Sequence, residues 1–188
     1  MIAPLVAIRP MVSVFIGWLP LASTVHDGTM TFQDPGPMLS EHRGVVAAPV
    51  GRVRQLVLAV STGEFSGADV PLVLGGQGDR RVVVSGGPEV FRASVTGVSL
   101  TIEVDHDAGW IQARGEWWWC GRFHVEADTS GNTVVRQQTF NCASGLSGKL
   151  VPFTVGRGHK QAGEQALLRL LDDLSQRLNC KAWMQPDR

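Results

Sequence analysis

This sequence lacks an excess of positive or of negative charge. Among 188 residues, 17 are Lys or Arg and 17 are Asp or Glu, so the formal net charge is zero. Proteins that bind nucleic acids usually carry a basic surface, because most of their affinity comes from contacts with phosphates. The balance of charge therefore argues against a nucleic acid partner.

Cysteine is also scarce, and its spacing excludes two common kinds of site. The chain has only Cys120, Cys142 and Cys180, with no Cys-x-x-Cys motif. An odd number of cysteines without that motif predicts neither a disulfide framework nor a cysteine-rich zinc site. We expect three free thiols, buried or half-buried, in a reducing compartment.

Signatures of cofactors, metals and hydrolases are missing as well. The segment SGLSGKL (144–150) lacks the first glycine and the final Ser or Thr of a phosphate-binding loop, and no Gly-x-Ser-x-Gly motif occurs. Asp105, His106 and Asp107 are of metal-ligating types, but neighbouring residues in a turn rarely converge on one ion. We therefore predict neither a cofactor nor a metal site.

What is present describes one globular domain with an unusual start. Apolar residues make up 44% of the chain and charged residues 18%, at a length that suits a single domain. Residues 1–38 are predicted to be an apolar arm and linker, residues 39–180 the domain, and residues 181–188 a tail. Prolines 4, 10 and 20 make residues 1–25 a poor spanning helix.

The same N-terminal segment bears on location. It carries a single charged residue, Arg9, before His26 and has only a mediocre cleavage site, so it is an incomplete signal peptide. If the segment is not a signal or an anchor, it is an irregular arm or upstream sequence translated from a misassigned start codon. We predict a cytoplasmic protein for which a membrane partner is not expected, and the alternative is export or membrane association through the apolar N-terminus.

From residue 39 onward, the pattern predicts a strand, a helix, a series of strands and a long helix. Ser40–Ala48 is read as a strand, and Pro49 begins a helix with Val53, Leu56, Val57 and Val60 on one face. Turn residues then separate predicted strands at 69–74, 80–85, 89–98, 99–104, 110–127 (one bent strand or two) and 133–142. Residues 158–178 carry a leucine stripe typical of an amphipathic helix.

This order of elements predicts an α+β fold in which a curved antiparallel sheet wraps around the long C-terminal helix. The segments VVAAPVGRVRQLVLAV (45–60) and KQAGEQALLRLLDDLSQRL (160–178) resemble the two ends of the START-like (SRPBCC) superfamily, the helix-grip proteins related to polyketide cyclases and dehydrases. The resemblance covers residues 40–179 in element order. It implies binding of a hydrophobic small molecule or lipid between the sheet and the helix. The short STGEFSGADVPL segment (61–72) departs from the family, which usually has a second helix there.

Three consecutive tryptophans are assigned to faces by the alternation of a strand. Trp117, Trp119 and Phe123 are predicted to face the helix. Trp118 is predicted to lie on the outer face with Cys120, Arg122, His124 and Glu126, whose charged members form a solvated ladder. An outward tryptophan also suggests a homodimer through this face.

The predicted ligand site combines the inner face of the sheet with the helix stripe. Its walls are Trp117, Trp119, Phe123, Leu100, Ile102, Leu167, Leu170, Leu171 and Leu174. Two alternatives stay open. A cyclase or dehydrase enzyme would need an acid or base in that cavity, for which His106, His124 and Glu116 are the candidates. An interaction protein would use Trp118 and the N-terminal arm as its surface.

Overall fold

A computed structural model describes residues 32–74, 81–95, 97–115, 117–154 and 156–186. Residues 33–188 form one compact unit. The N-terminal segment 1–31, and with it the predictions about an arm, a start site or a signal, lies outside the described residues, as does Glu116.

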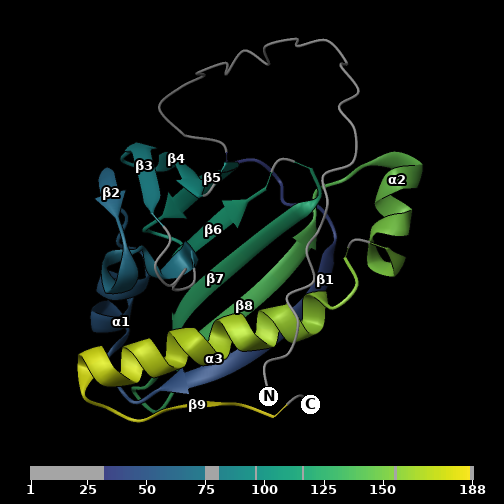
Figure 1. Ribbon diagram of the computed structural model, residues 1–188. Coiled ribbons are helices and arrows are strands. Elements are labelled where there is room, and N and C mark those ends of the chain that lie inside the picture. The colour runs from purple at the N-terminus through teal and green to yellow at the C-terminus, as the bar shows by residue number, and fades with distance from the viewer. Residues whose placement is uncertain (1–31, 75–80, 96, 116, 155, 187–188) are drawn as a thin grey trace, which may run out of the picture. The chain divides into compact units, whose positions relative to one another are not determined.

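Within the described ranges, nine antiparallel strands form a single curved sheet (Figure 1). In chain order they are β1 (Met38–Val46), β2 (Gly63–Phe65), β3 (Val82–Gly86), β4 (Val90–Val95), β5 (Val98–Asp105), β6 (Trp110–Arg114), β7 (Trp119–Ala127), β8 (Thr133–Asn141) and β9 (Ala182–Met184). Their order in space is β2-β3-β4-β5-β6-β7-β8-β1-β9. The first long strand therefore joins the last part of the sheet, next to β8.

Helices connect and cover the strands. Helix α1 (Val50–Val57) follows β1, α2 (Gly145–Leu150) follows β8, and α3 (His159–Leu178) precedes β9. Short 3-10 turns lie at Gly67–Asp69, Leu72–Leu74 and Val151–Phe153. The predicted fold class, an α+β fold with a curved antiparallel sheet and a long C-terminal helix, is confirmed.

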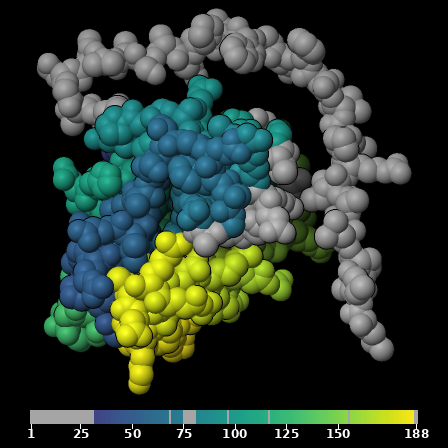
Figure 2. Space-filling model, turned by 60° about the vertical axis from the view of Figure 1, so that its left-hand side comes forward, coloured from purple at the N-terminus to yellow at the C-terminus, as the bar shows by residue number. Residues whose placement is uncertain are grey.

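Helix α3 lies across the inner face of the sheet because one side of it is leucine-rich. Leu167, Leu170, Leu171 and Leu174 are buried and belong to the same core as Phe123 and Val125 of β7. At Gly44 of β1, an added Cβ would lie 2.6 Å from Leu171 Cδ1, so the missing side chain lets the helix approach the strand closely. In Figure 2, the yellow end of α3 meets the blue segment after α1, where Arg177 borders a groove with Leu56 and Leu72.

The structure corrects several sequence-based predictions. Residues 69–74, predicted as a strand, contain the last residue of one 3-10 turn and the whole of another, because Pro71 interrupts the run and cannot donate to a sheet. The bent segment 110–127 is two strands, β6 and β7. Strand β2 and helix α2 were not predicted, and the residues expected to be a C-terminal tail include β9, which pairs with β1.

The inner face of the sheet changes character along β1 and β8. Near α1 it is apolar, with Val46 and Val135 fully buried. Toward the opposite end it becomes polar, since the buried inward residues are Ser40, His42, Gln137, Thr139 and Asn141. The register pairs His42 with Gln137 and Ser40 with Thr139. This polar end of the sheet faces the beginning of α3, where alanine and glycine stand in place of leucine.

Candidate functional site

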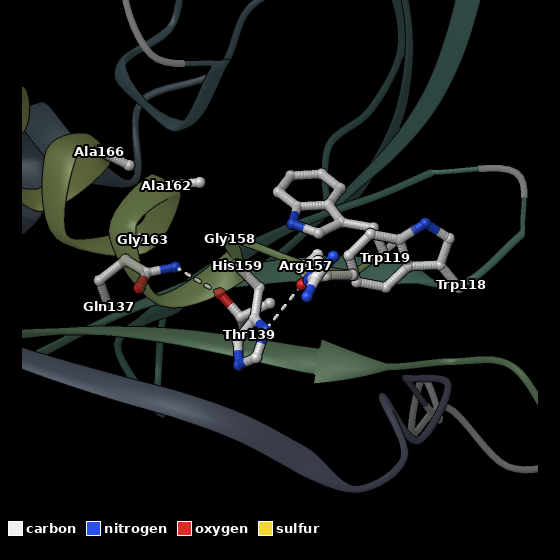
Figure 3. A pocket seen from close by; sticks show the side chains of 11 residues that line it. Trp118, Trp119, Gln137, Thr139, Arg157, Gly158, His159, Ala162, Gly163 and Ala166 are labelled. Atoms are coloured by element: carbon white, nitrogen blue, oxygen red, sulfur yellow. Dashed lines mark hydrogen bonds between the residues drawn. The ribbon is translucent and has the colours of Figure 1, made fainter. Parts of the chain in front are cut away.

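A pocket of about 230 Å³ opens where the start of α3 meets the ends of β7 and β8 (Figure 3). Three parts of the chain contribute to it: the end of the tryptophan run, strand β8, and the first turns of the helix with the loop before them. Its lining residues are Trp118, Trp119, Gln137, Thr139, Gly156, Arg157, Gly158, His159, Ala162, Gly163 and Ala166.

Small residues on the helix create this space. Ala162, Gly163 and Ala166 stand on the sheet side of the first two turns of α3, whereas the following turns carry the buried leucines. At Gly163 an added Cβ would lie 2.4 Å from Gln137 Oε1 and 3.2 Å from His42 Cδ2. The glycine therefore lets the helix backbone come down onto the polar end of the sheet while the alanines on either side leave a gap.

Two tryptophans form the aromatic side of the pocket. Trp119 is half-buried, and its ring lies over Gly121 of the same strand, where an added Cβ would be 2.6 Å from Trp119 Cζ2. Trp118 is also half-buried, and its carbonyl accepts a hydrogen bond from Cys142 N at 2.6 Å. In Figure 3 both indoles lie across the pocket from the alanines of α3, and the Arg157 side chain lies between the indoles and the helix.

The floor of the pocket is polar, and some of its atoms lack a partner. Gln137 Nε2 donates to Thr139 Oγ1 at 3.1 Å, whereas Gln137 Oε1 is buried and accepts no hydrogen bond within the described chain. His159 Nδ1 donates to Gly156 O at 2.8 Å, and its buried Nε2 likewise has no partner there. Buried polar atoms are normally hydrogen-bonded, so these two are suited to a ligand or to water.

A second layer of polar groups lies beside this floor. His42 Nε2 and Ser40 Oγ on β1 are buried, and no hydrogen bond satisfies them among the residues described. They neighbour Gln137 and Thr139 through the strand register. Four polar atoms that have no partner in the described chain thus belong to the polar end of the inner face and to the first residue of α3 above it.

The predicted ligand walls are placed differently from what the sequence suggested. Ile102, Phe123, Leu167, Leu170, Leu171 and Leu174 are 0–6% exposed and pack against one another as core, and Leu100 is half-buried against them. Of the predicted walls, only Trp119 lines the pocket. The open space lies beyond the end of the leucine stripe, where alanine and glycine replace leucine.

Trp117 and Trp118 are both placed differently from the prediction. Strand β7 begins at Trp119, so the strict alternation does not extend back to Trp117. Trp117 is 53% exposed, so it is not buried in the core beneath α3 as the predicted inward position required. Trp118 lines the pocket rather than standing outward among charges, so the predicted outer position is wrong as well.

The predicted catalytic candidates do not meet in the pocket. His106 lines a separate shallow pocket beside α1, with Arg54 and Leu58. His124 is on the outer face, where Nε2 donates to Ala108 O at 3.0 Å and Nδ1 lies 3.2 Å from Glu126 Oε1. Glu116 is outside the described residues.

Sequence reasoning missed His42, Gln137, Thr139 and His159. A signal was present in segment 133–141, where the alternate residues that follow Val135, namely Gln137, Thr139 and Asn141, are all polar. That trend shows that one end of the inner face is polar. Only the pairing of β1 with β8 adds His42 to this end, and pairing between distant segments cannot be read from local spacing.

The outer face carries a solvated ladder at one end and a buried polar cluster at the other. Glu126 pairs with Arg136 at 2.7 Å near the β7–β8 turn, as the predicted charge ladder requires. Arg122, predicted to belong to that ladder, instead donates to the fully buried Gln112 Oε1 from Nη2 at 2.7 Å. Its guanidinium stacks over Trp110, 4.5 Å from the ring centroid. Burial lowers the pKa of Arg122 below its ordinary value.

No cluster of three or more His, Cys, Asp or Glu side chains in the described part of the chain could hold a metal ion. The Asp105 carboxylate, which the sequence analysis assigned to a turn, accepts a hydrogen bond from Ala108 N at 2.8 Å. None of the described helices combines the length and the hydrophobicity that crossing a membrane requires.

No protein-family model and no curated protein sequence matches this chain. Solved structures with a related backbone include a protein from Nitrosospira multiformis, with a TM-score of 0.48, 15% identity, and coverage of 75% of this chain and 95% of that one. A protein from Thermus thermophilus has a TM-score of 0.41 and 15% identity, with coverage of 73% of this chain and 99% of that one. The di-domain ARO/CYC protein StfQ from the steffimycin biosynthetic pathway has a TM-score of 0.37 and 13% identity, with coverage of 73% of this chain and 44% of that one. Similarity at this level concerns the fold and assigns no activity.

Proposed function

We propose that the protein binds a small aromatic molecule with a polar substituent in the pocket at the start of α3. The observation that carries this proposal is the pairing of an aromatic side, Trp118 and Trp119, with a floor that holds the unpartnered atoms Gln137 Oε1 and His159 Nε2. Apolar walls with a few convergent polar groups are typical of small-molecule sites. We also propose that the protein is a member of the START-like superfamily and that it is cytoplasmic.

The size of the pocket favours a compact ligand over a whole lipid. A cavity of roughly 150 Å³ in an engineered protein holds benzene, whereas drug-sized ligands usually occupy about 300–1,000 Å³. A volume of about 230 Å³ therefore suits one or two fused rings. Gln137 Oε1 offers an acceptor for a hydroxyl group on such a ring.

The first test compares 1-naphthol with naphthalene, which differ by one hydroxyl group. We expect the wild-type protein to bind 1-naphthol more tightly in a calorimetric titration or by quenching of tryptophan fluorescence. In Gln137→Leu, the affinity for 1-naphthol falls about fivefold while that for naphthalene is unchanged, because a hydrogen bond is worth roughly 1 kcal/mol. Equal losses for both compounds would contradict the role of Gln137, and binding of neither by the wild type would contradict the proposed ligand class.

An acid–base enzyme of the cyclase or dehydrase kind is the second candidate, and His159 is the observation that favours it. Its Nδ1 is fixed by Gly156 O, so in the neutral ring Nε2 is left as an acceptor at the pocket. A positioned imidazole can remove a proton from a carbon between two carbonyl groups. We expect the protein to speed deuterium exchange at that carbon in a cyclic 1,3-diketone, measured by NMR, and His159→Gln to abolish the acceleration while still binding naphthalene. No acceleration by the wild type argues for a binding protein.

A further inference from the structure

Two cysteines lie side by side on the outer face of the sheet, at the same end as the pocket. Cys120 is opposite Phe140 in the β7–β8 register, and Cys142 follows two residues later, with its amide bonded to Trp118 O. Residues two apart in a strand share a face, so both thiols point to the same side. The register makes the two residues diagonal neighbours across β7 and β8, close enough for their side chains to influence each other. In agreement with this placement, each thiol is the largest influence on the pKa of the other.

The surroundings of the two thiols differ in a way that separates their chemistry. Cys120 is fully buried and donates to Gln112 Oε1 at 3.7 Å. Cys142 is only half-buried, and its sulfur accepts a hydrogen bond from Arg114 Nη1 at 3.3 Å. A cationic donor beside a partly accessible thiol stabilises the thiolate, which is the nucleophilic form. Cys142 is therefore the thiol that a dissolved reagent reaches and that reacts with it.

The pKa values of the two thiols are shifted in opposite directions, in agreement with this geometry. The interaction with Cys120 lowers the pKa of Cys142 to about 7, against the effect of burial and with help from Arg114. The interaction with Cys142, together with burial, raises the pKa of Cys120 above the usual range of a thiol. At neutral pH, one sulfur of the pair is substantially ionised while its neighbour keeps its proton.

We propose that Cys142 and Cys120 are a redox-active pair that hydroperoxides convert to an intramolecular disulfide. The Cys142 thiolate attacks the outer oxygen of the peroxide, so an S–O bond forms, the O–O bond breaks and an alkoxide or hydroxide leaves. Cys120 sulfur then attacks the resulting sulfenic acid, so that the S–S bond forms and hydroxide leaves and takes up the Cys120 proton as water. The two sulfurs together lose two electrons, and the peroxide gains them.

The fold around the pair does not depend on the thiols alone. Residues 33–37 lie against this part of the sheet through Arg114 Nη2, which donates to Gln33 O at 3.0 Å, and through Asn141 N, which donates to Pro37 O at 2.9 Å. In its protonated form, the Cys142 thiol also donates to Pro35 O of the same segment at 3.5 Å. Oxidation therefore removes one anchor of the segment and leaves the others in place.

The full-length protein provides a direct test, because trypsin places each cysteine in its own peptide: 115–122, 137–149 and 178–181. After treatment with one equivalent of hydrogen peroxide and alkylation with N-ethylmaleimide, we expect peptides 115–122 and 137–149 to be linked, and linkage to be lost on reduction. Peptide 178–181, with Cys180, carries the alkyl group. Alkylation of all three cysteines after peroxide treatment would overturn the proposal, as would preferential loss of Cys180.

Variants separate the two roles. In Cys120→Ser we expect a sulfenic acid on peptide 137–149 that dimedone traps, and in Cys142→Ser no oxidation of peptide 115–122. Cys180→Ser is the matched control and reacts like the wild type. Arg114→Met slows alkylation of Cys142 about tenfold at neutral pH by removing the cationic donor. A Cys142 that reacts no faster than Cys180 in the folded wild type at neutral pH would overturn the proposal.

Discussion

Replacing Gln112 with leucine is expected to lower the free energy of unfolding by about 3 kcal/mol, although the two side chains have similar volumes. Gln112 is fully buried and links groups of opposite charge: its Nε2 donates to Glu103, and its Oε1 accepts from Arg122 Nε at 3.0 Å and Nη2 at 2.7 Å. Leucine leaves the 7%-exposed Glu103 and the Arg122 guanidinium without these partners. Thermal unfolding should occur about 6–12 °C lower.

Gln138→Leu is the matched control, on β8, which is separated from the strand of Gln112 by β7. Gln138 Nε2 also donates to a carboxylate, Glu41 Oε2 at 2.8 Å, but both side chains are half-exposed on the outer face. Water can replace the lost partner there, so we expect a change below about 1 kcal/mol. Equal effects of the two substitutions would show that burial of Gln112 does not decide the outcome. Urea denaturation followed by circular dichroism measures both.

Replacing Ala166 with phenylalanine is expected to abolish binding of 1-naphthol, by about 100-fold or more, while leaving the fold intact. Ala166 is half-buried and lines the pocket, so a benzyl group attached there occupies the space between α3 and Trp119. Because the ring enters a gap of about 230 Å³ and displaces no core side chain, we expect the stability to change by less than about 1.5 kcal/mol.

Gln165→Phe is the control for this substitution, since residue 165 is exposed on the same turn of α3. It should bind 1-naphthol as the wild type does. Calorimetry of the three proteins, together with their melting temperatures, separates a blocked pocket from an unfolded one. If Ala166→Phe binds 1-naphthol with unchanged affinity, the ligand occupies another place and the proposed site is wrong.

The periodic elements could be predicted from the sequence because burial on one face leaves a local trace. The leucine stripe of α3 and the alternation in β5 and β7 each repeat with the period of their element, so helix, strands and inner face follow from short windows. Phe123 and Val125 face the helix for this reason. The prediction failed at Trp117, where the strand has not yet begun.

The candidate site could not be predicted in the same way because it is assembled from distant segments. Gln137 meets His42 through a strand pairing that spans most of the domain, and His159 reaches the pocket because the loop before α3 turns back at Gly156. The sequence analysis placed the ligand beside leucines and aromatics, which are most suitable for a core and are used as one. Alanine and glycine, which contribute little to any hydrophobic pattern, define the open space.

The outer face shows how tertiary cover changes the meaning of a polar residue. His124, Glu126 and Arg136 form the solvated ladder that alternation predicts. Arg122 has the same place in the pattern, yet Trp110 and Phe140 pack against its guanidinium at 4.5 and 5.1 Å from their ring centroids. Whether a charged residue on an outward position is solvated therefore depends on its neighbours across the sheet.

The short strands at the two ends of the sheet have a consequence for self-association. Open sheet edges offer unpaired backbone groups to other molecules, and long flat edges promote aggregation. Here β2 and β9 are three residues each, and the edge at β2 carries the Arg81–Glu64 ion pair. Strand β9 covers β1 from Gly44 to Val46, and beyond it Gln185 N donates to Arg43 O at 2.8 Å. A second chain that pairs with either edge strand therefore finds a strand of only three residues, which at β2 is also charged. This arrangement disfavours the growth of fibrils by strand addition.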